Sequence, residues 1–223
     1  AFIPYIMAGA PSLEKTIENV MLLEECGADI IELGVPFSDP LADGPTIQRA
    51  AERALAAGIT LVKVTHLVSQ IRTFSQIPIV LMTYYNPIFK YGEERFIKDA
   101  VRAGVDGIIV PDLPPDEADN LLKFARISNL DTIFLVAPTT TKKRLKTIIK
   151  ASKGFIYYVS ITGITGAKLT LDETFTEQLI LIKNQTEKPV AVGFGVSTPG
   201  EAYTVSRLAD GAIIGSAIVK VLN

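Results

Sequence analysis

The sequence predicts an α/β fold with a parallel sheet, because short runs of Ile and Val alternate with amphipathic helical patterns along the whole chain. A similar helix-to-strand phrase, in which small residues and Asp precede a pair of Ile residues, recurs at 26–31, 103–109 and 208–214. Such a recurring joint is typical of a wound βα repeat. Eight units that close on themselves would form a TIM (β/α)8 barrel, and an open doubly wound sheet is the alternative.

Eight runs have the length and apolar character of buried strands. They cover residues 2–7, 29–33, 77–82, 107–110, 132–136, 155–159, 189–192 and 211–214. No linker or break in composition divides them, so residues 1–223 are expected to form a single TIM-barrel domain. The chain begins inside a strand-like segment without an initiator Met, and we expect residues to be missing at the start.

The helical patterns carry their own boundary signals. The first helix is expected to follow the N-cap Ser12 and to end at Gly27, a residue suited to a left-handed C-terminus. Its expected buried face is Leu13, Ile17, Val20 and Met21. In the pattern over 60–74, Leu61, Val64, Leu67, Val68 and Ile71 mark the buried face, which places His66 on the exposed one.

Composition excludes several classes of function. A net charge of -2 gives no reason to expect a nucleic-acid partner, and the basic residues from Lys142 to Lys150 are spaced as one solvated helix face. No apolar run is long enough for a membrane span, and no signal peptide is visible. With one His and one Cys, a metal cluster of those residues is excluded, and no metal site is predicted. Cys26 is expected to be a small buried residue in a reducing compartment.

Two carboxyl groups are the candidate catalytic residues. Glu32 lies late in the second strand, where the alternation of side chains places it opposite Ile31 and Leu33 and so inside the barrel mouth. Apolar surroundings raise the pKa of a carboxyl and suit it to proton transfer near neutral pH. Asp43 follows on a loop that could bring it over the same mouth. The alternatives are a structural ion pair for Glu32 and local backbone hydrogen bonds for Asp43.

A second group of residues follows the last strands. Gly195 comes after the seventh strand, and Gly215 and Ser216 open the final helix after the eighth. Glycines and a helix N-terminus with a hydroxyl can hold a phosphate, and the alternative is that the glycines serve only tight turns. The polar loop 160–168 has the composition of a lid, and its Gly166 could add a further N–H to the phosphate. Tyr5, Tyr84 and Phe194 could line a slot for a flat apolar group.

Residues 32–48, ELGVPFSDPLADGPTIQ, closely resemble the signature of the tryptophan synthase alpha subunit family. The runs 162–167, 193–197 and 215–219 resemble that family's lid and phosphate loops in the same order. The resemblance covers essentially the whole chain, although the family usually has a helix before the first strand and more helix beyond Asn223.

The resemblance implies a lyase that splits indole-3-glycerol phosphate into indole and glyceraldehyde 3-phosphate by a retro-aldol reaction. Glu32 would be the acid and base of the reaction, and Asp43 would stabilise positive charge at the ring nitrogen. Tyr157 would be a further group beside the substrate, and Thr165 would close over the loop aspartate. The phosphate would be bound at Gly166, Phe194, Gly195, Gly215 and Ser216.

The family also implies a partner. Asp39 and Pro40, with Pro114 in the run Asp112-Leu113-Pro114, fall where the family contacts its beta subunit in an alpha2beta2 complex. The alpha subunit would need no cofactor, since pyridoxal phosphate belongs to the beta partner, and a cytoplasmic or plastid location is expected. Three alternatives stay open: a stand-alone indole-releasing lyase, a chain that mainly activates the beta subunit, and another phosphate-binding barrel isomerase.

Overall fold

The computed structural model describes residues 1–159, 173–193 and 195–222. Its strands are β1 Phe2–Met7, β2 Ile31–Gly34, β3 Ile79–Met82, β4 Gly107–Ile109, β5 Asp131–Ile133, β6 Leu135–Val136, β7 Ile156–Val159, β8 Val190–Gly193 and β9 Gly211–Ile214. Its helices are α1 Leu13–Glu25, α2 Pro45–Ala56, α3 Leu61–Ile71, α4 Tyr85–Tyr91, α5 Glu93–Ala103, the 3-10 turn η1 Pro115–Glu117, α6 Asp119–Ile127, α7 Lys142–Ala151, α8 Glu173–Lys183, α9 Pro199–Leu208 and α10 Ser216–Leu222.

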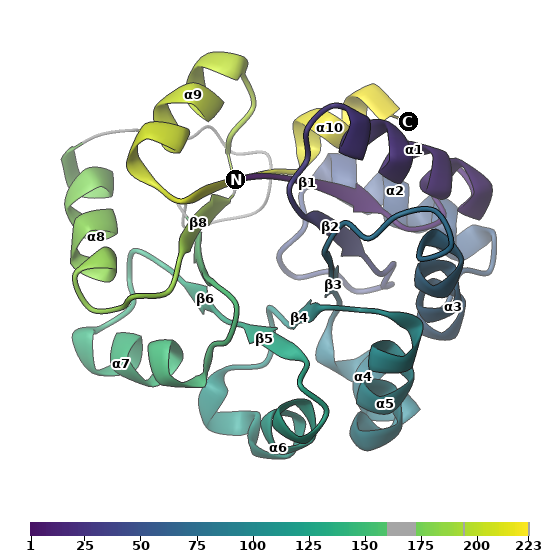
Figure 1. The fold of residues 1–223 in the computed structure, drawn as a ribbon, viewed down its shortest axis with the longest axis horizontal. Helices are drawn as coiled ribbons and strands as arrows, with labels where there is room; N and C mark the ends of the chain where they lie inside the picture. The colour runs from purple at the N-terminus through teal and green to yellow at the C-terminus, as the bar shows by residue number, and fades with distance from the viewer. Residues whose placement is uncertain (160–172, 194, 223) are drawn as a thin grey trace.

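The strands form one parallel sheet in the order β5-β4-β3-β2-β1-β9-β8-β7-β6. Its two ends, β5 and β6, are consecutive pieces of one stretch of chain, separated only by Phe134. β5 pairs with β4, whereas β6 pairs with β7, so the change of neighbour at Phe134 closes the sheet. The helices surround the strands as a ring (Figure 1). The predicted TIM barrel is confirmed, and each of the eight predicted strands is present, the fifth as two pieces.

α1 illustrates how a helix is fixed on the barrel. The Ser12 side chain caps its first turn by accepting from the Lys15 N–H, and Gly27 follows its end with φ +88°, both as predicted. Thr16 accepts a hydrogen bond from the Gly9 N–H and donates to the Ser12 carbonyl, which turns this side of the helix inward. The buried face is therefore Thr16, Asn19, Val20 and Leu23.

Two predictions about this helix were wrong. Met21 is 40% exposed because the inward stripe passes through Thr16 and Val20, which leaves Met21 on the outer surface. Cys26 is exposed as well, at the C-cap of the helix, where the chain turns back toward β2. On α3 the prediction was right: its five expected apolar residues are buried and His66 is exposed.

The recurring joint before β2, β4 and β9 forms the same structure each time. Each joint carries an aspartate, namely Asp29, Asp106 or Asp210, that forms two hydrogen bonds with the first residue of a neighbouring strand. The aspartate backbone N–H donates to the carbonyl of that residue, and the aspartate carboxylate accepts the N–H of the same residue. The residues bound in this way are Phe2, Ile79 and Val190. These reciprocal pairs satisfy backbone groups at the N-terminal end of the barrel and fix the register of adjacent strands.

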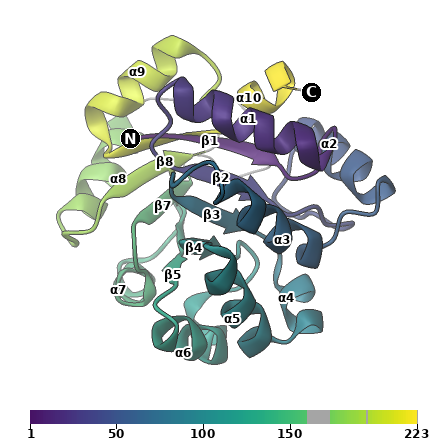
Figure 2. The ribbon, with the colours of Figure 1, turned by 45° about the vertical axis from the view of Figure 1, so that its right-hand side comes forward.

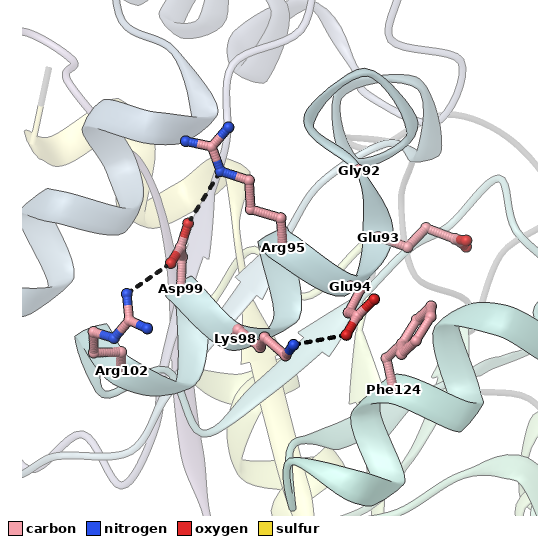
Figure 3. Close-up of a pocket in the computed structure, with 8 residues that line it drawn as sticks. All are labelled: Gly92, Glu93, Glu94, Arg95, Lys98, Asp99, Arg102 and Phe124. Carbon is pink, nitrogen blue, oxygen red and sulfur yellow. Dashed lines mark hydrogen bonds and ion pairs between the residues drawn. The ribbon is translucent and has the colours of Figure 1, made fainter.

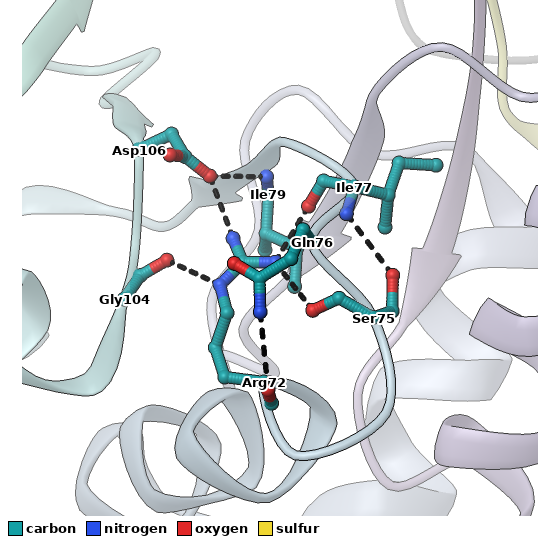
Figure 4. A network of polar contacts seen from close by, with 7 residues as sticks. All are labelled: Arg72, Ser75, Gln76, Ile77, Ile79, Gly104 and Asp106. Atoms are coloured by element: carbon teal, nitrogen blue, oxygen red, sulfur yellow. Dashed lines mark hydrogen bonds and ion pairs between the residues drawn. The ribbon is translucent and has the colours of Figure 1, made fainter.

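Arg72 strengthens one of these joints (Figure 4). Its guanidinium donates to the Gly104 carbonyl at 2.9 Å and the Ile77 carbonyl at 2.6 Å, and it forms an ion pair with Asp106 at 2.6 Å. The network joins the end of α3, the start of β3 and the joint between α5 and β4.

α10 contacts both α2 and β1, and Figure 2 shows α10 on the same side of the barrel as α1 and α2. Gly215, the residue before α10, thereby lies against the Tyr5 side chain of β1. Within the described residues, no single helix has the length and hydrophobicity to cross a lipid bilayer, and only the sharply bent pair α2 and α3 meets that criterion jointly.

Candidate active site

Glu32 lies in the middle of β2, between Tyr5 of β1 and Val80 of β3 in the sheet register. Its side chain lines a cavity at the C-terminal end of the barrel and is only 1% exposed. Within the described part of the chain, no Lys or Arg pairs with Glu32, and its Oε2 has no hydrogen-bond partner. Burial, supplemented by the charge of Asp43, raises the pKa of Glu32 to about 8. A carboxyl in this state is a proton donor at neutral pH.

Asp43 lies on the loop between β2 and α2, immediately before the N-cap Gly44. Its side chain is 6% exposed and lines the same cavity as Glu32. Burial raises the pKa of Asp43 to about 6, although a hydrogen bond from Tyr84 acts in the lowering direction. Two neighbouring carboxyls with separated pKa values can be protonated and ionised at the same pH, which is the arrangement that acid and electrostatic catalysis need.

The cavity has a volume of about 580 Å³. Among the described residues it is lined by Tyr5, Glu32, Asp43, Ile47, Met82, Tyr157, Gly195, Val196, Ser197, Thr198, Glu201, Ile213, Gly215, Ser216, Ala217, Lys220 and Val221. This size suits a metabolite of about drug size or smaller. Its walls combine aromatic and aliphatic side chains with polar groups. A ligand with an apolar ring and a charged end would therefore place the ring against the apolar side chains and the charge against the polar groups.

Two tyrosines form the wall around the carboxyl groups. Burial and the charges of Asp43 and Glu32 raise the pKa of Tyr5 and of Tyr157, so both hydroxyls remain protonated. Tyr5 lies against Gly34 and Tyr157 against Gly193, in each case so closely that a Cβ on the glycine would collide with the hydroxyl. The two glycines therefore make space for tyrosine rings inside the barrel.

The helix N-termini α9 and α10 differ in their readiness to bind an anion. At α9, the Glu201 carboxylate accepts from the Ser197 and Thr198 N–H groups at 2.8 and 3.0 Å, so these donors are already occupied by a negative charge. At α10, Gly215 and Ser216 themselves line the cavity at the start of the helix. Lys220 is the one basic residue on the described lining. An anionic group is therefore better placed at α10 than at α9.

The sequence interpretation did not identify every residue of this site. The lining residues that it did not predict as site residues are Ile47, Met82, Val196, Ser197, Thr198, Glu201, Ile213, Ala217, Lys220 and Val221. Thr198 and Glu201 form a capping box, whose S/T-x-x-E spacing is visible in the sequence and marks the start of α9. That spacing is a signal by which the two helix N-termini can be told apart from sequence alone.

The other predicted site residues lie elsewhere. Tyr84 is buried behind Asp43 and is not part of the described cavity lining. Asp39 is exposed on the β2–α2 loop, and Pro40 and Pro114 are half-buried outside the cavity. Thr165, Gly166 and Phe194, together with the predicted lid, lie outside the described residues.

Two other hollows do not have the features of this site. A surface groove of about 680 Å³ lies along α5 and faces Phe124 (Figure 3). Its charges are paired with one another, Lys98 with Glu94 at 2.6 Å and Asp99 with Arg102 at 3.0 Å, so none of these groups is held ready for a ligand. A hollow of about 380 Å³ lies at the opposite, N-terminal end of the strands, beside Ile3, Pro78 and Gly107. No group of three or more His, Cys, Asp or Glu among the described residues could hold a metal ion.

Comparisons with known proteins identify relatives over the whole chain. The family model described as tryptophan synthase alpha chain matches residues 1–223. The tryptophan synthase alpha chains of Geotalea uraniireducens and Geobacter sulfurreducens are 50% and 51% identical to it over 223 residues, which is 100% of this chain and 84% of each relative.

Solved structures agree with these relatives. A chain from a study of mutual activation in the tryptophan synthase a2b2 complex of Pyrococcus furiosus has a TM-score of 0.91 and 43% identity, covering 100% of this chain and 90% of that one. A chain of Mycobacterium tuberculosis tryptophan synthase has a TM-score of 0.92 and 41% identity, covering 99% and 84%.

Proposed function

We propose that this chain, which belongs to the tryptophan synthase alpha chain family, cleaves indole-3-glycerol phosphate into indole and glyceraldehyde 3-phosphate in tryptophan biosynthesis. The observation that carries the proposal is the pair of buried carboxyls, Glu32 and Asp43, on one cavity with pKa values of about 8 and about 6. The anion-suited end at Gly215 and Ser216 lines the same cavity and supports a phosphate ester as the substrate.

The proposed reaction is a retro-aldol cleavage that begins with a proton transfer. Glu32, protonated at neutral pH, donates its proton to the indole ring carbon that bears the glycerol phosphate chain. The ring then carries positive charge at its nitrogen, and the ionised Asp43 stabilises that charge. Both carboxyl groups therefore act in the protonation states that their pKa values give them near pH 7.

The second half of the reaction returns the proton. The Glu32 carboxylate accepts the proton of the hydroxyl on the carbon attached to the ring, while the bond between that carbon and the ring breaks. The bonding electrons return to the ring and restore neutral indole, and the hydroxyl carbon becomes the aldehyde of glyceraldehyde 3-phosphate. Glu32 ends protonated, ready for the next turnover.

The walls and the anion end would hold the substrate in register. Tyr5 and Tyr157 offer aromatic faces and protonated hydroxyls beside the indole and its side chain. Gly195, Gly215 and Ser216 would receive the phosphate, and Thr165, Gly166 and Phe194 belong to the same proposed site by their match to the family motifs.

The family partner is the tryptophan synthase beta subunit, as in the a2b2 complex named for Pyrococcus furiosus. We propose an alpha2beta2 complex for this chain as well, with Asp39, Pro40 and Pro114 at the contact. The alpha chain needs no cofactor, because pyridoxal phosphate belongs to the beta subunit. A cytoplasmic location is part of the same proposal, which is supported by bacterial relatives in a biosynthetic enzyme family.

The proposal is tested by incubating the purified chain with indole-3-glycerol phosphate, with and without a beta subunit, and measuring indole. Indole release that rises with the beta subunit supports the alpha-subunit role. High turnover that is indifferent to the partner would instead identify a stand-alone lyase. If the chain activates the beta subunit but releases no indole from indole-3-glycerol phosphate, only a regulatory role remains. An Asp43→Ala variant that still activates the beta subunit normally would support that regulatory role. A chain that releases no indole and does not activate the beta subunit would contradict the proposal.

A further inference from the structure

Tyr84 lies at the centre of the contacts that shape the β2–α2 loop. It follows β3 and precedes α4, and only 4% of it is exposed. The Phe37 ring stacks on the Tyr84 ring with centroids 5.1 Å apart. The Ala42 N–H donates to the Tyr84 hydroxyl at 3.0 Å. The loop is thus held at two points by one side chain from the segment that follows the neighbouring strand β3.

The same hydroxyl donates to the Oδ2 of Asp43 at 3.4 Å. A phenol has one proton, and because the Ala42 N–H occupies a lone pair of the oxygen, the proton is free to point toward the carboxylate. Burial, followed by the charge of Asp43, raises the pKa of Tyr84, so the hydroxyl remains a donor over the working pH range. The separation is long for an O–H···O bond, so a moderate effect on Asp43 is expected.

We propose that Tyr84 is a positioning residue for the cleavage reaction, which holds the Asp43 carboxylate at the cavity through its hydroxyl while making no contact with the substrate itself. This inference rests on the proposed function. Asp43 lines the cavity and Tyr84 does not belong to its described lining, so Tyr84 acts on the reaction through Asp43. Sequence alone had placed Tyr84 beside the substrate.

The charged and titratable surroundings of Asp43 determine what the loss of this hydroxyl does. Among the described residues, Glu32 of β2, Tyr5 of β1 and Tyr157 of β7 interact electrostatically with Asp43, and Asp112 after β4 acts on Tyr84. None of these is a cation, and Lys220, the basic residue on the described lining, is not among the causes of the Asp43 shift, so the Tyr84 hydroxyl is the group that favours the ionised form of Asp43 against burial. Removing it must therefore raise the pKa of Asp43 above about 6.

The test is Tyr84→Phe, which removes the hydroxyl and keeps the ring that stacks on Phe37. Tyr91→Phe is the matched control, since Tyr91 donates to the Asp99 carboxylate at 2.9 Å on the outside of the barrel. We expect kcat to fall about tenfold in Tyr84→Phe with KM changed less than about threefold, and the acid limb of the pH–rate profile to move up by about half a pH unit or more. Tyr91→Phe should retain the kcat and the acid limb of the parent chain.

Two further measurements separate positioning from a general structural role. The Asp43 carboxyl can be titrated by carbon-13 NMR in the free chain, where Tyr84→Phe is expected to raise its pKa whether or not the chain cleaves indole-3-glycerol phosphate. In an Asp43→Asn background, Tyr84→Phe should reduce residual activity much less than in the parent, because both changes affect one interaction.

An unmoved acid limb together with an unmoved Asp43 titration would overturn the proposal, even if kcat fell. Full activity in Tyr84→Phe would overturn it too. Absence of cleavage in the parent chain with a normal Asp43 shift would instead reject the proposed function and leave the Tyr84–Asp43 contact established.

Discussion

Replacing Glu32 by Gln is predicted to abolish catalysis and yet to make the protein relatively more stable at alkaline pH. The pKa of the buried Glu32 is raised from 4.5 to about 8, so the folded protein retains a proton that the unfolded chain has lost between these two values. Where the folded state binds more protons than the unfolded state, stability decreases as pH rises. Gln resembles the protonated carboxyl and never ionises, so the variant escapes this decrease.

The magnitude follows from the two pKa values. Each pH unit between them corresponds to about 1.4 kcal/mol, so the parent chain should lose about 5 kcal/mol relative to the Glu32→Gln variant across the full interval. The side chain is only 1% exposed, so solvent screening reduces the figure little. At pH 5 the parent is largely protonated, and the two proteins should differ mainly by the constant effect of exchanging a hydroxyl for an amide, on the order of 1–2 kcal/mol.

The assay is urea denaturation of both proteins at several values between pH 5 and pH 9. Glu25→Gln, at an exposed position of α1, controls for the loss of one negative charge. The parent should become progressively less stable than Glu32→Gln as the pH rises, by at least about 3 kcal/mol over this range. A stability difference that is the same at pH 5 and pH 9 would refute the reasoning, because it would mean that Glu32 ionises as easily in the folded state as in the unfolded one.

Three further predictions test other parts of the structure. The pH dependence of kcat/KM for indole-3-glycerol phosphate should be bell-shaped, with limbs near the Asp43 pKa of about 6 and the Glu32 pKa of about 8. Between these values the ionised Asp43 and the protonated Glu32 coexist, and a flat profile from pH 5 to 9 would contradict this assignment. Gly34→Ala should destabilise the chain by about 1–3 kcal/mol, because the new Cβ collides with the Tyr5 hydroxyl and ring. Adding Tyr5→Phe should recover part of this loss in thermal melts, and fully additive stability changes of the two substitutions would refute the collision. Arg72→Met should lower the free energy of unfolding in urea by about 2–4 kcal/mol, because three guanidinium interactions are lost. The kcat at low temperature should stay unchanged, since these interactions lie at the N-terminal end of the strands, away from the cavity. Unaltered stability would show that the network is dispensable.

The sequence predicted the strands well because buried parallel strands are encoded locally, in short runs of Ile and Val. It could not show that the stretch around Phe134 changes partner from β4 to β7, since barrel closure depends on the curvature of the whole sheet. The joint carrying Asp106 was recognised as a repeat, but its hydrogen bonds to Ile79 connect residues 27 positions apart, which no local pattern displays.

The same distinction holds at the candidate site. Glu32 was placed inside the barrel by alternation along a single strand, and the structure has it there. The buried face of α1 was misjudged because a polar residue, Thr16, turns inward through bonds to Gly9 and Ser12. The contact between Tyr84 and Asp43 joins residues 41 positions apart, which follow two adjacent strands, β3 and β2, so only the folded chain reveals it.

The most direct test of the proposed catalytic role is the release of indole from indole-3-glycerol phosphate by the parent chain and by Glu32→Gln at pH 7, with binding of a phosphate-ester ligand measured alongside. The account predicts that the variant binds the ligand with nearly unchanged affinity and produces no indole above background. Near-normal indole release by Glu32→Gln would contradict it.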